Sequence, residues 1–201
     1  MSISVIAGLG NPGLKYRGTR HNLGYELIDR LAEQLDSQWK TIPKFEAKIA
    51  HANFCDKKLV LVKPLTFMNS CSRSLGSILR YWSLSPESLL VLYDDITLEF
   101  SRVKLSQNGS SGGHNGIADL QQHLGDHFAR FRIGIGAKPH KEMDLADYVL
   151  SHLTKHEQNL LAKLVPSYLE HISLIIDSGI EAAMNIINQR TATSHERNNC
   201  K

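Results

Sequence analysis

The chain has 201 residues, 42% of them hydrophobic and 21% charged, which is typical of one compact globular domain and excludes a disordered, collagen-like or disulfide-rich chain. Three widely spaced cysteines form neither a disulfide framework nor a CxxC site, and no apolar run approaches the length of a membrane span, so we expect a cytoplasmic protein. The formal charge of +3 permits a polyanionic partner without requiring one.

Short apolar runs rich in β-branched residues alternate with helical patterns along the chain. Each run is closed by glycine, proline or acidic residues, and buried strands are therefore predicted at 3–7, 59–62, 89–93 and 131–135. Helices are predicted at 23–35, 70–82 and 117–124, the second with Asn69 as its N-cap. This alternation indicates an α/β fold.

The remaining segments complete the predicted domain. A weaker apolar run at 45–54 precedes the strand at 59–62 and predicts an antiparallel hairpin. Helical periodicity continues from residue 139 to about 189. We therefore predict a single α/β domain over 1–190, with a twisted, mixed but mostly parallel sheet flanked by helices and a helical C-terminal part. Residues 191–201 have no apolar period and are predicted to be a flexible tail.

Two glycine motifs suggest functions that their surroundings do not support. Residues 8–13, GLGNPG, match the dinucleotide-binding fingerprint, but no apolar helical face follows until Leu23 and no acidic residue ends a second strand. Residues 109–113, GSSGG, match the nucleophile elbow of serine hydrolases, but two glycines follow Ser111 where a helix should begin. We predict neither nicotinamide chemistry nor a serine nucleophile.

Two histidines spaced four apart, His152 and His156, would share one face of a helix. No glutamate follows His152 as in the HExxH motif, and the sequence offers no third ligand. The simpler interpretation is a pair of solvated histidines on a surface helix, and no metal site is predicted there.

Polar residues stand where sites form in α/β proteins, beyond strand ends and before helices. Asn11 follows the first predicted strand, His21 precedes the first helix, and Asp94 follows the strand at 89–93. Because the carboxyl ends of parallel strands lie at one edge of a sheet, we expect these three side chains to converge. Residues 67–69 and 114–115 lie at similar junctions.

These residue types favour hydrolysis by water rather than covalent catalysis. A neutral imidazole takes a proton from water when a carboxylate fixes its tautomer, and asparagine amides bind amide-bearing ligands or stabilise negative charge. This chemistry needs neither a metal nor a cofactor. Each residue also has a simpler interpretation, because aspartate after a strand and asparagine before a helix are common caps.

Basic side chains accompany these residues along the chain. Charged runs usually lie on solvated faces, but around a cleft they could bind phosphates. They are Lys15, Arg17 and Arg20, then Lys104, Arg130, Arg132 and Lys138.

Five sequence blocks, in this order, closely resemble the bacterial-type peptidyl-tRNA hydrolases. They are GLGNPGLKY at 8–16 with TRHN at 19–22, KPLTFMN at 63–69, DD at 94–95, GSSGGHNG at 109–116 and RIGIG at 132–136. Any one block is weakly specific, but the five together are highly specific. The resemblance extends from residue 3 to about 150, and the helical C-terminal part also fits.

The resemblance implies an activity and a role for each matching residue. The family cleaves the ester between a peptide, or an N-blocked amino acid, and the 3′ end of tRNA, which recycles tRNA from aborted translation. His21 would be the general base and Asp94 its supporting carboxylate, while Asn11 would separate blocked from unblocked substrates by contacting the first peptide bond. The residues implied to hold or line the path of the tRNA or its peptidyl end are Tyr16, Phe67, Met68, Asn69, His114 and Asn115. The resemblance also implies a monomer that needs no metal or cofactor.

One position departs from the family pattern. Ser106 follows Val103-Lys104-Leu105 where the family often carries another basic residue, so Lys104 and Arg132 remain the candidate phosphate contacts. A second candidate function is an RNA-binding protein that uses the same cleft only to dock RNA. The presence of both His21 and Asp94 favours the enzyme, because a binding protein needs no base and carboxylate pair.

Overall fold

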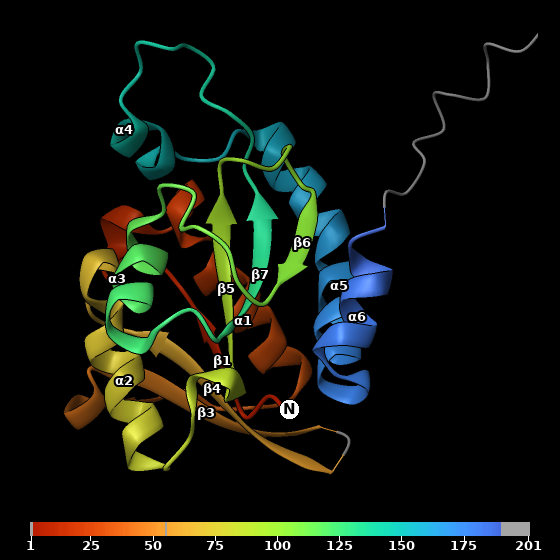
Figure 1. The fold of residues 1–201 in the computed structure, drawn as a ribbon. Coiled ribbons are helices and arrows are strands. Elements are labelled where there is room, and N and C mark those ends of the chain that lie inside the picture. Colours follow the sequence, from red (N-terminus) through yellow and green to blue (C-terminus); the bar gives the residue numbers. More distant parts are fainter. Residues whose placement is uncertain (1, 55, 190–201) are drawn as a thin grey trace, which may run out of the picture.

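The computed structural model describes residues 2–54 and 56–189 of the chain. Within them lies a seven-stranded sheet in the order β2-β3-β4-β1-β5-β7-β6, with helices on both faces (Figure 1). The four central strands run parallel, and the strands at the two edges pair antiparallel. The predicted mixed sheet is confirmed, while the predicted tail at 191–201 lies outside the described residues.

The predicted strands are all present, and two further strands extend the sheet. The predicted set corresponds to β1 (Val5–Gly8), β3 (Ala47–Phe54), β4 (Lys57–Pro64), β5 (Leu89–Asp95) and β7 (Ala129–Gly134). The additional strands are β2 (Lys40–Ile42) and β6 (Val103–Ser106), one at each edge. Both are short, β2 is mostly exposed, and β6 buries only Leu105, so neither shows the apolar run that marks a strand in the sequence.

The helices agree with the predicted ones in place but differ at several ends. Their bounds are α1 (Leu23–Gln34), α2 (Cys71–Tyr81), α3 (Asn115–Leu124), α4 (Leu145–Leu150), α5 (Lys155–Ser178) and α6 (Ile180–Ile187). The prediction of Asn69 as the N-cap of α2 is wrong, because a 3₁₀ turn, Met68–Ser70, precedes the helix and makes Ser70 its N-cap residue.

The C-terminal part is helical but not continuously so. Residues 139–144 form a loop before α4, and Gly179, with φ of 84°, separates α5 from α6. His152 lies before α5 in a β-bridge with Thr19, so the prediction that His152 and His156 share a helical face is wrong. Both histidines are exposed, as expected.

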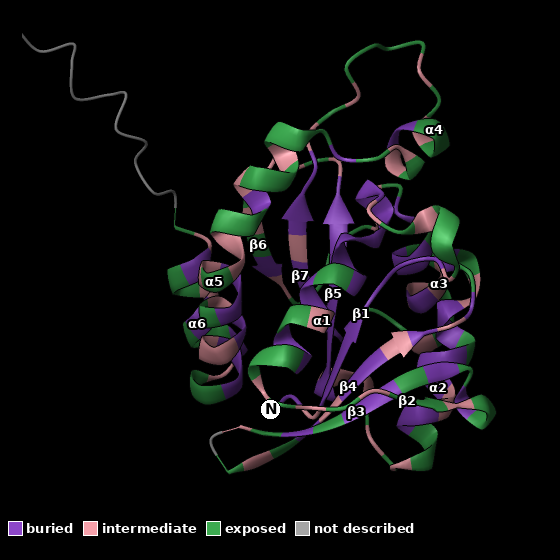
Figure 2. Ribbon diagram, turned by 180° about the vertical axis from the view of Figure 1, so that it is seen from behind, coloured by how far each residue is buried: buried purple, intermediate pink, exposed green. Residues whose placement is uncertain are grey.

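Alternating side chains along the central strands supply two hydrophobic cores, one on each face of the sheet. Ile6, Leu90 and Leu92 pack with α1, α5 and α6, whereas Val5 and Val91 pack with α2 and α3. Figure 2 shows the buried central strands between these helical layers. Because both faces are covered, the strands read as continuous apolar runs in the sequence.

The first glycine motif serves close packing of α1 on the sheet. A Cβ atom on Gly8 would lie 2.3 Å from the Gly24 carbonyl oxygen, and one on Gly24 would lie 2.3 Å from the Leu92 carbonyl oxygen. After Gly13 the chain enters a 3₁₀ turn, Leu14–Tyr16, and not a helix that could hold a pyrophosphate. The approach of α1 brings the end of β1 close to the residues that precede the helix.

Among the residues that the structure describes, no helix is both long and apolar enough to cross a membrane.

Substituting Gly24 by alanine tests this packing. We expect Gly24→Ala to lower the free energy of unfolding by about 1–3 kcal/mol, because the added methyl group meets backbone atoms that must move. The matched control is Gly76→Ala in α2, where the nearest atom to the new Cβ lies 3.3 Å away on the Leu124 side chain. Urea unfolding should show the control unchanged or stabilised by up to about 1 kcal/mol. Equal stability of the two variants would contradict the proposed contact.

Candidate active site

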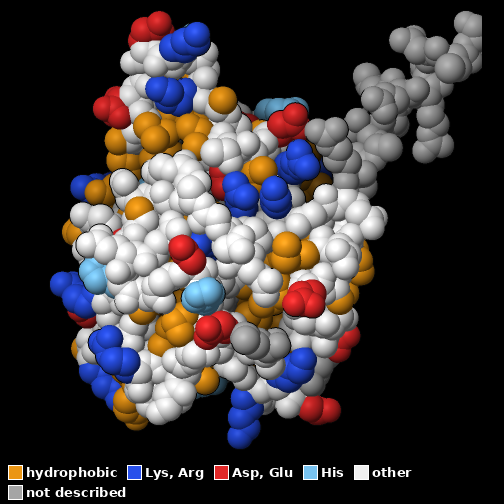
Figure 3. Space-filling model, viewed as in Figure 1, with side chains coloured by type: hydrophobic (Ala, Val, Ile, Leu, Met, Phe, Trp, Pro, Cys, Tyr) orange, Lys and Arg blue, Asp and Glu red, His pale blue; other side chains and the backbone are white. Residues whose placement is uncertain are grey.

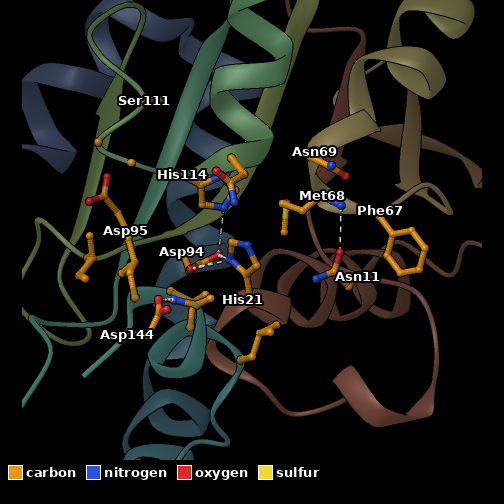
Figure 4. A pocket seen from close by; sticks show the side chains of 18 residues that line it. Asn11, His21, Phe67, Met68, Asn69, Asp94, Asp95, Ser111, His114 and Asp144 are labelled. Atoms are coloured by element: carbon orange, nitrogen blue, oxygen red, sulfur yellow. Dashed lines mark hydrogen bonds and ion pairs between the residues drawn. The ribbon is translucent and has the colours of Figure 1, made fainter. Parts of the chain in front are cut away.

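A cleft of about 630 Å³ opens at the carboxyl edge of the parallel strands, where ligands bind in open α/β sheets. The ends of β1 and β5, the turn before α2, the glycine-rich loop before α3, and α4 all contribute to it. Of the nine residues predicted as catalytic or substrate-binding, eight line the cleft: Asn11, His21, Phe67, Met68, Asn69, Asp94, His114 and Asn115 (Figure 4).

His21 and Asp94 form a buried pair at the floor of the cleft. The Nδ1 atom of His21 lies 3.0 and 3.1 Å from the two carboxylate oxygens of Asp94. The side chains are 7% and 2% exposed, so the carboxylate depends on protein groups for its hydrogen bonds. Burial alone would raise the pKa of Asp94, but the charge interactions and hydrogen bonds with His21 and His114 outweigh it and hold the pKa below its usual range. Asp94 is therefore ionised at neutral pH.

His114 contacts the same carboxylate, and its ring lies beside that of His21 at a centroid distance of 4.7 Å. Its Nε2 atom lies 3.2 Å from Asp94 Oδ1, and its Nδ1 atom accepts a hydrogen bond from the backbone N–H of Ile117 as the N-cap of α3. Because Nδ1 is occupied as an acceptor, the ring proton of neutral His114 belongs on Nε2, where it is donated to Asp94. Sequence reasoning placed His114 in the cleft but did not recognise this cap.

The amide of Asn11 is held in one orientation by its neighbours. Its Oδ1 atom accepts the backbone N–H of Met68 at 2.9 Å, and its own backbone exchanges two hydrogen bonds with the Asn22 side chain. No other described residue makes a hydrogen bond to the Nδ2 group of Asn11. The Nδ2 group of Asn11 is thus an oriented N–H donor in the cleft.

An aromatic edge lies beside Asn11. The side chain of Phe67 is exposed, and the Tyr16 ring packs edge-on against it at a centroid distance of 6.5 Å. Tyr16 does not itself line the cleft, so the structure places it behind Phe67. Asn69 and Asn115, both exposed, line the cleft from the turn before α2 and from the start of α3 (Figure 4 shows Asn69).

Sequence reasoning missed the wall formed by α4. Asp144, Leu145, Ala146, Val149 and Leu150 line the cleft, and hydrophobic side chains gather over this helix in Figure 3. Asp144 caps α4 by accepting the N–H of Ala146 at 2.9 Å. An aspartate before an apolar residue is the local signal that could have located this short helix.

Ser111 also lines the cleft but is not a nucleophile elbow. It belongs to the loop between β6 and α3, and not to a strand that turns directly into a helix. The exclusion of a serine nucleophile in this motif thus agrees with the backbone.

Three arginines among the seven basic residues considered near the cleft are engaged by protein partners, whereas Lys15, Arg17 and Lys104 are exposed. Arg20 pairs with Glu157, and Arg130 is buried and donates to the carbonyl oxygens of Gly109 and Ser110. Arg132 pairs with Asp95 at 2.7 Å and keeps 21% of its side chain exposed.

Lys104 remains exposed, and its strand register places it opposite Arg132. Figure 3 shows Lys and Arg side chains over this β6–β7 edge of the sheet. Neither Lys104 nor Arg132 lines the cleft, so a contact with phosphate would lie outside it.

His21, Asp94 and His114 also include the donor types of a metal site. One ligand atom from each lies within 4.8 Å of the others. Asp94 already accepts hydrogen bonds from both histidines at 3.0–3.2 Å, and these hydrogen bonds account for the arrangement of the three side chains.

Comparison with known proteins places this chain in a family. A family model described as peptidyl-tRNA hydrolase matches residues 5–195. The chain is 41% identical to the peptidyl-tRNA hydrolase of Caldicellulosiruptor saccharolyticus over 185 residues, which cover 92% of this chain and 96% of that protein. It is 38% identical to the peptidyl-tRNA hydrolase of Gloeobacter violaceus over 192 residues, which cover 95% and 96%.

A solved structure agrees with these sequence relationships. The crystal structure of peptidyl-tRNA hydrolase from Acinetobacter baumannii matches with a TM-score of 0.87 and 34% identity, covering 92% of this chain and 94% of that one. This chain therefore belongs to the peptidyl-tRNA hydrolase family, as its five sequence blocks predicted.

Proposed function

We propose that this chain hydrolyses the ester bond between a peptide, or an N-blocked amino acid, and the 3′ end of tRNA, using water activated by His21. The observation that carries the proposal is the buried contact of His21 Nδ1 with both oxygens of Asp94. We expect the enzyme to act as a cytoplasmic monomer and to need no metal or cofactor.

The hydrogen bonds support one arrangement of protons in the pair. Ionised Asp94 can only accept, so the neutral form of His21 donates its Nδ1–H and has an unprotonated Nε2. In the proposed reaction, Nε2 takes a proton from water while the water oxygen attacks the ester carbonyl carbon. When the tetrahedral intermediate collapses, the carbon–oxygen bond to the ribose breaks, and the proton on Nε2 passes to the departing oxygen. Asp94 stabilises the imidazolium in between.

Asn11 supplies a physical reason for preferring N-blocked substrates. Its Oδ1 atom is occupied by the Met68 N–H, which leaves Nδ2 to donate. The carbonyl oxygen of a peptide bond or N-acyl group accepts such a hydrogen bond, whereas a free α-ammonium group only donates. Burying that ammonium beside an N–H donor would be unfavourable, so unblocked aminoacyl-tRNA would react poorly.

The surroundings of the cleft suit the two ends of the substrate. The exposed ring of Phe67, supported by Tyr16, offers a stacking face for a base near the 3′ end. The apolar side chains of α4 offer a sequence-tolerant surface to the peptide, and Asn69 and Asn115 offer amides to its backbone. Lys104, on the exposed β6 edge, is the proposed phosphate contact.

Removing the base tests the reaction. We expect His21→Ala to lower kcat for release of N-acetyl-amino acid from tRNA by about 10²–10⁴-fold, because general base catalysis is lost. Asp94→Asn should act in the same direction, while filter binding shows tRNA still bound. The matched control is His156→Ala, an exposed histidine outside the cleft. Undiminished turnover by His21→Ala would refute this role, and a wild-type chain that binds tRNA without cleaving it would favour the RNA-binding alternative.

Exchanging one atom of Asn11 tests the discrimination. Asn11→Asp keeps the acceptor for the Met68 N–H but replaces the Nδ2 donor by a carboxylate oxygen, which attracts an ammonium group. We expect the ratio of kcat/KM for N-acetyl-aminoacyl-tRNA over aminoacyl-tRNA to fall by about tenfold or more. Asn11→Ala should lower the ratio less, because it removes the donor without adding charge. An unchanged ratio in both variants would count against Asn11.

The proton assignments can be observed directly. In a uniformly ¹⁵N-labelled sample, long-range ¹H–¹⁵N correlation spectra should show neutral His21 protonated on Nδ1 and neutral His114 protonated on Nε2. In Asp94→Ala the partner that selects the His21 tautomer is gone, so the two neutral His21 tautomers should become mixed, whereas neutral His114 should stay protonated on Nε2 because the Ile117 N–H still occupies its Nδ1. A wild-type His21 protonated on Nε2 would be inconsistent with the proposed base.

A further inference from the structure

We propose that Arg20 is a positioning residue, which clamps the segment carrying His21 to the junction of α4 and α5 and thereby fixes the catalytic base against the α4 wall of the cleft. The inference rests on the proposed function, since it concerns the same His21. Sequence reasoning considered Arg20 only as a member of a basic group beside the cleft.

Each of the three guanidinium nitrogens of Arg20 donates a hydrogen bond to a protein partner. Both terminal nitrogens donate to the two carboxylate oxygens of Glu157, at 2.8 and 2.9 Å, and Nε donates to the Ser151 hydroxyl at 3.2 Å. The same group lies 4.8 Å from the centre of the Tyr148 ring. The Arg20 side chain is only 8% exposed. A bidentate arginine–carboxylate pair of this kind fixes the orientation of the two side chains as well as the distance between them.

The partners of Arg20 are themselves anchored. Glu157 forms a capping box with Thr154 at the start of α5, and the Tyr148 hydroxyl donates to the Ile135 carbonyl oxygen beyond β7 at 2.6 Å. Arg20 therefore connects His21 to α5, to α4 and through Tyr148 to the sheet. None of these partners lines the cleft, so the effect on chemistry would be indirect.

Backbone contacts run beside this clamp. The N–H of Arg20 donates to the Ser151 carbonyl oxygen at 3.0 Å, and Thr19 pairs with His152. Arg20 and His21 belong to one 3₁₀ turn, Arg20–Asn22. A shift of Arg20 would thus move the neighbouring His21 relative to Asp94, which is held separately on β5.

The geometry also explains why lysine is a poor substitute. An ammonium group keeps the charge but cannot make the parallel pair of hydrogen bonds or the flat stack on Tyr148. Removal of either charged partner would leave the other uncompensated in a largely buried setting.

Steady-state kinetics on the full chain tests the proposal with N-acetyl-aminoacyl-tRNA. We expect Arg20→Lys and Glu157→Gln each to lower kcat by about 10–100-fold, because a displacement of about 1 Å at a reacting group costs this much. KM should change by less than about threefold, and its dependence on salt should keep the wild-type slope, because no phosphate contact is lost. The double variant Arg20→Lys/Glu157→Gln should lose less than the product of the two single losses, because the residues act as one unit.

Two controls separate this role from general destabilisation. Arg73→Gln breaks another Arg–Glu pair, with Glu46, away from the cleft and should keep the wild-type kcat. Circular dichroism should show every variant folded at the assay temperature. In folded Arg20→Lys, the imidazole nitrogen resonances of His21 should shift, a change that loss of stability alone does not produce.

The outcomes of the two proposals are distinguishable. Absence of turnover by the wild-type chain would refute the proposed function. If the wild-type chain turns over substrate and both single variants keep its kcat and its His21 resonances, the clamp alone is refuted. A fall in the salt slope by about one in Arg20→Lys would identify Arg20 as a phosphate contact and overturn the positioning role.

Discussion

The buried carboxylate of Asp94 is the constraint on which the cleft depends. It accepts hydrogen bonds from His21 and His114, which come from segments far apart in the chain. A charge at 2% exposure is tolerated only when such partners are present, so one carboxylate holds both the turn that carries His21 and the start of α3 in place. Because Asp94 lies within the last residues of a central strand buried on both faces, this anchor is held firmly in place.

The polar groups of the cleft are oriented by hydrogen bonds that face away from the ligand. Met68 occupies the Asn11 oxygen, Ile117 occupies one nitrogen of His114, and Asp94 occupies one nitrogen of His21. Asn11 and His21 consequently each keep one defined donor or acceptor for the proposed substrate, whereas Ile117 and Asp94 together occupy both nitrogens of His114. Groups held in this way need no reorganisation during the proposed reaction. Hydrolysis of an ester by a positioned water needs little more than this, because no covalent intermediate must be formed.

The net charge of +3 is a poor guide to tRNA binding, because several of the cations are engaged by protein partners. Internal contacts engage Arg20, Arg130 and Arg132, whereas Lys104 on β6 is exposed. Internal arginines stabilise loops and turns around the cleft and contribute little to long-range attraction of a polyanion. Recognition of tRNA would then depend on a local contact near the 3′ end and not on the charge of the whole surface.

The sequence by itself determined the α/β class, the strands of the central sheet, and the convergence of Asn11, His21 and Asp94, because buried runs and strand ends have local signatures. It did not reveal β2, β6 or the α4 wall, whose segments are short and whose burial depends on distant partners. Only the tertiary structure decided that Arg20 pairs with Glu157 and that His114 is a cap bound to Asp94. A side chain's role depends on which donor or acceptor meets it, and the residues that meet Arg20 lie more than a hundred positions away along the chain.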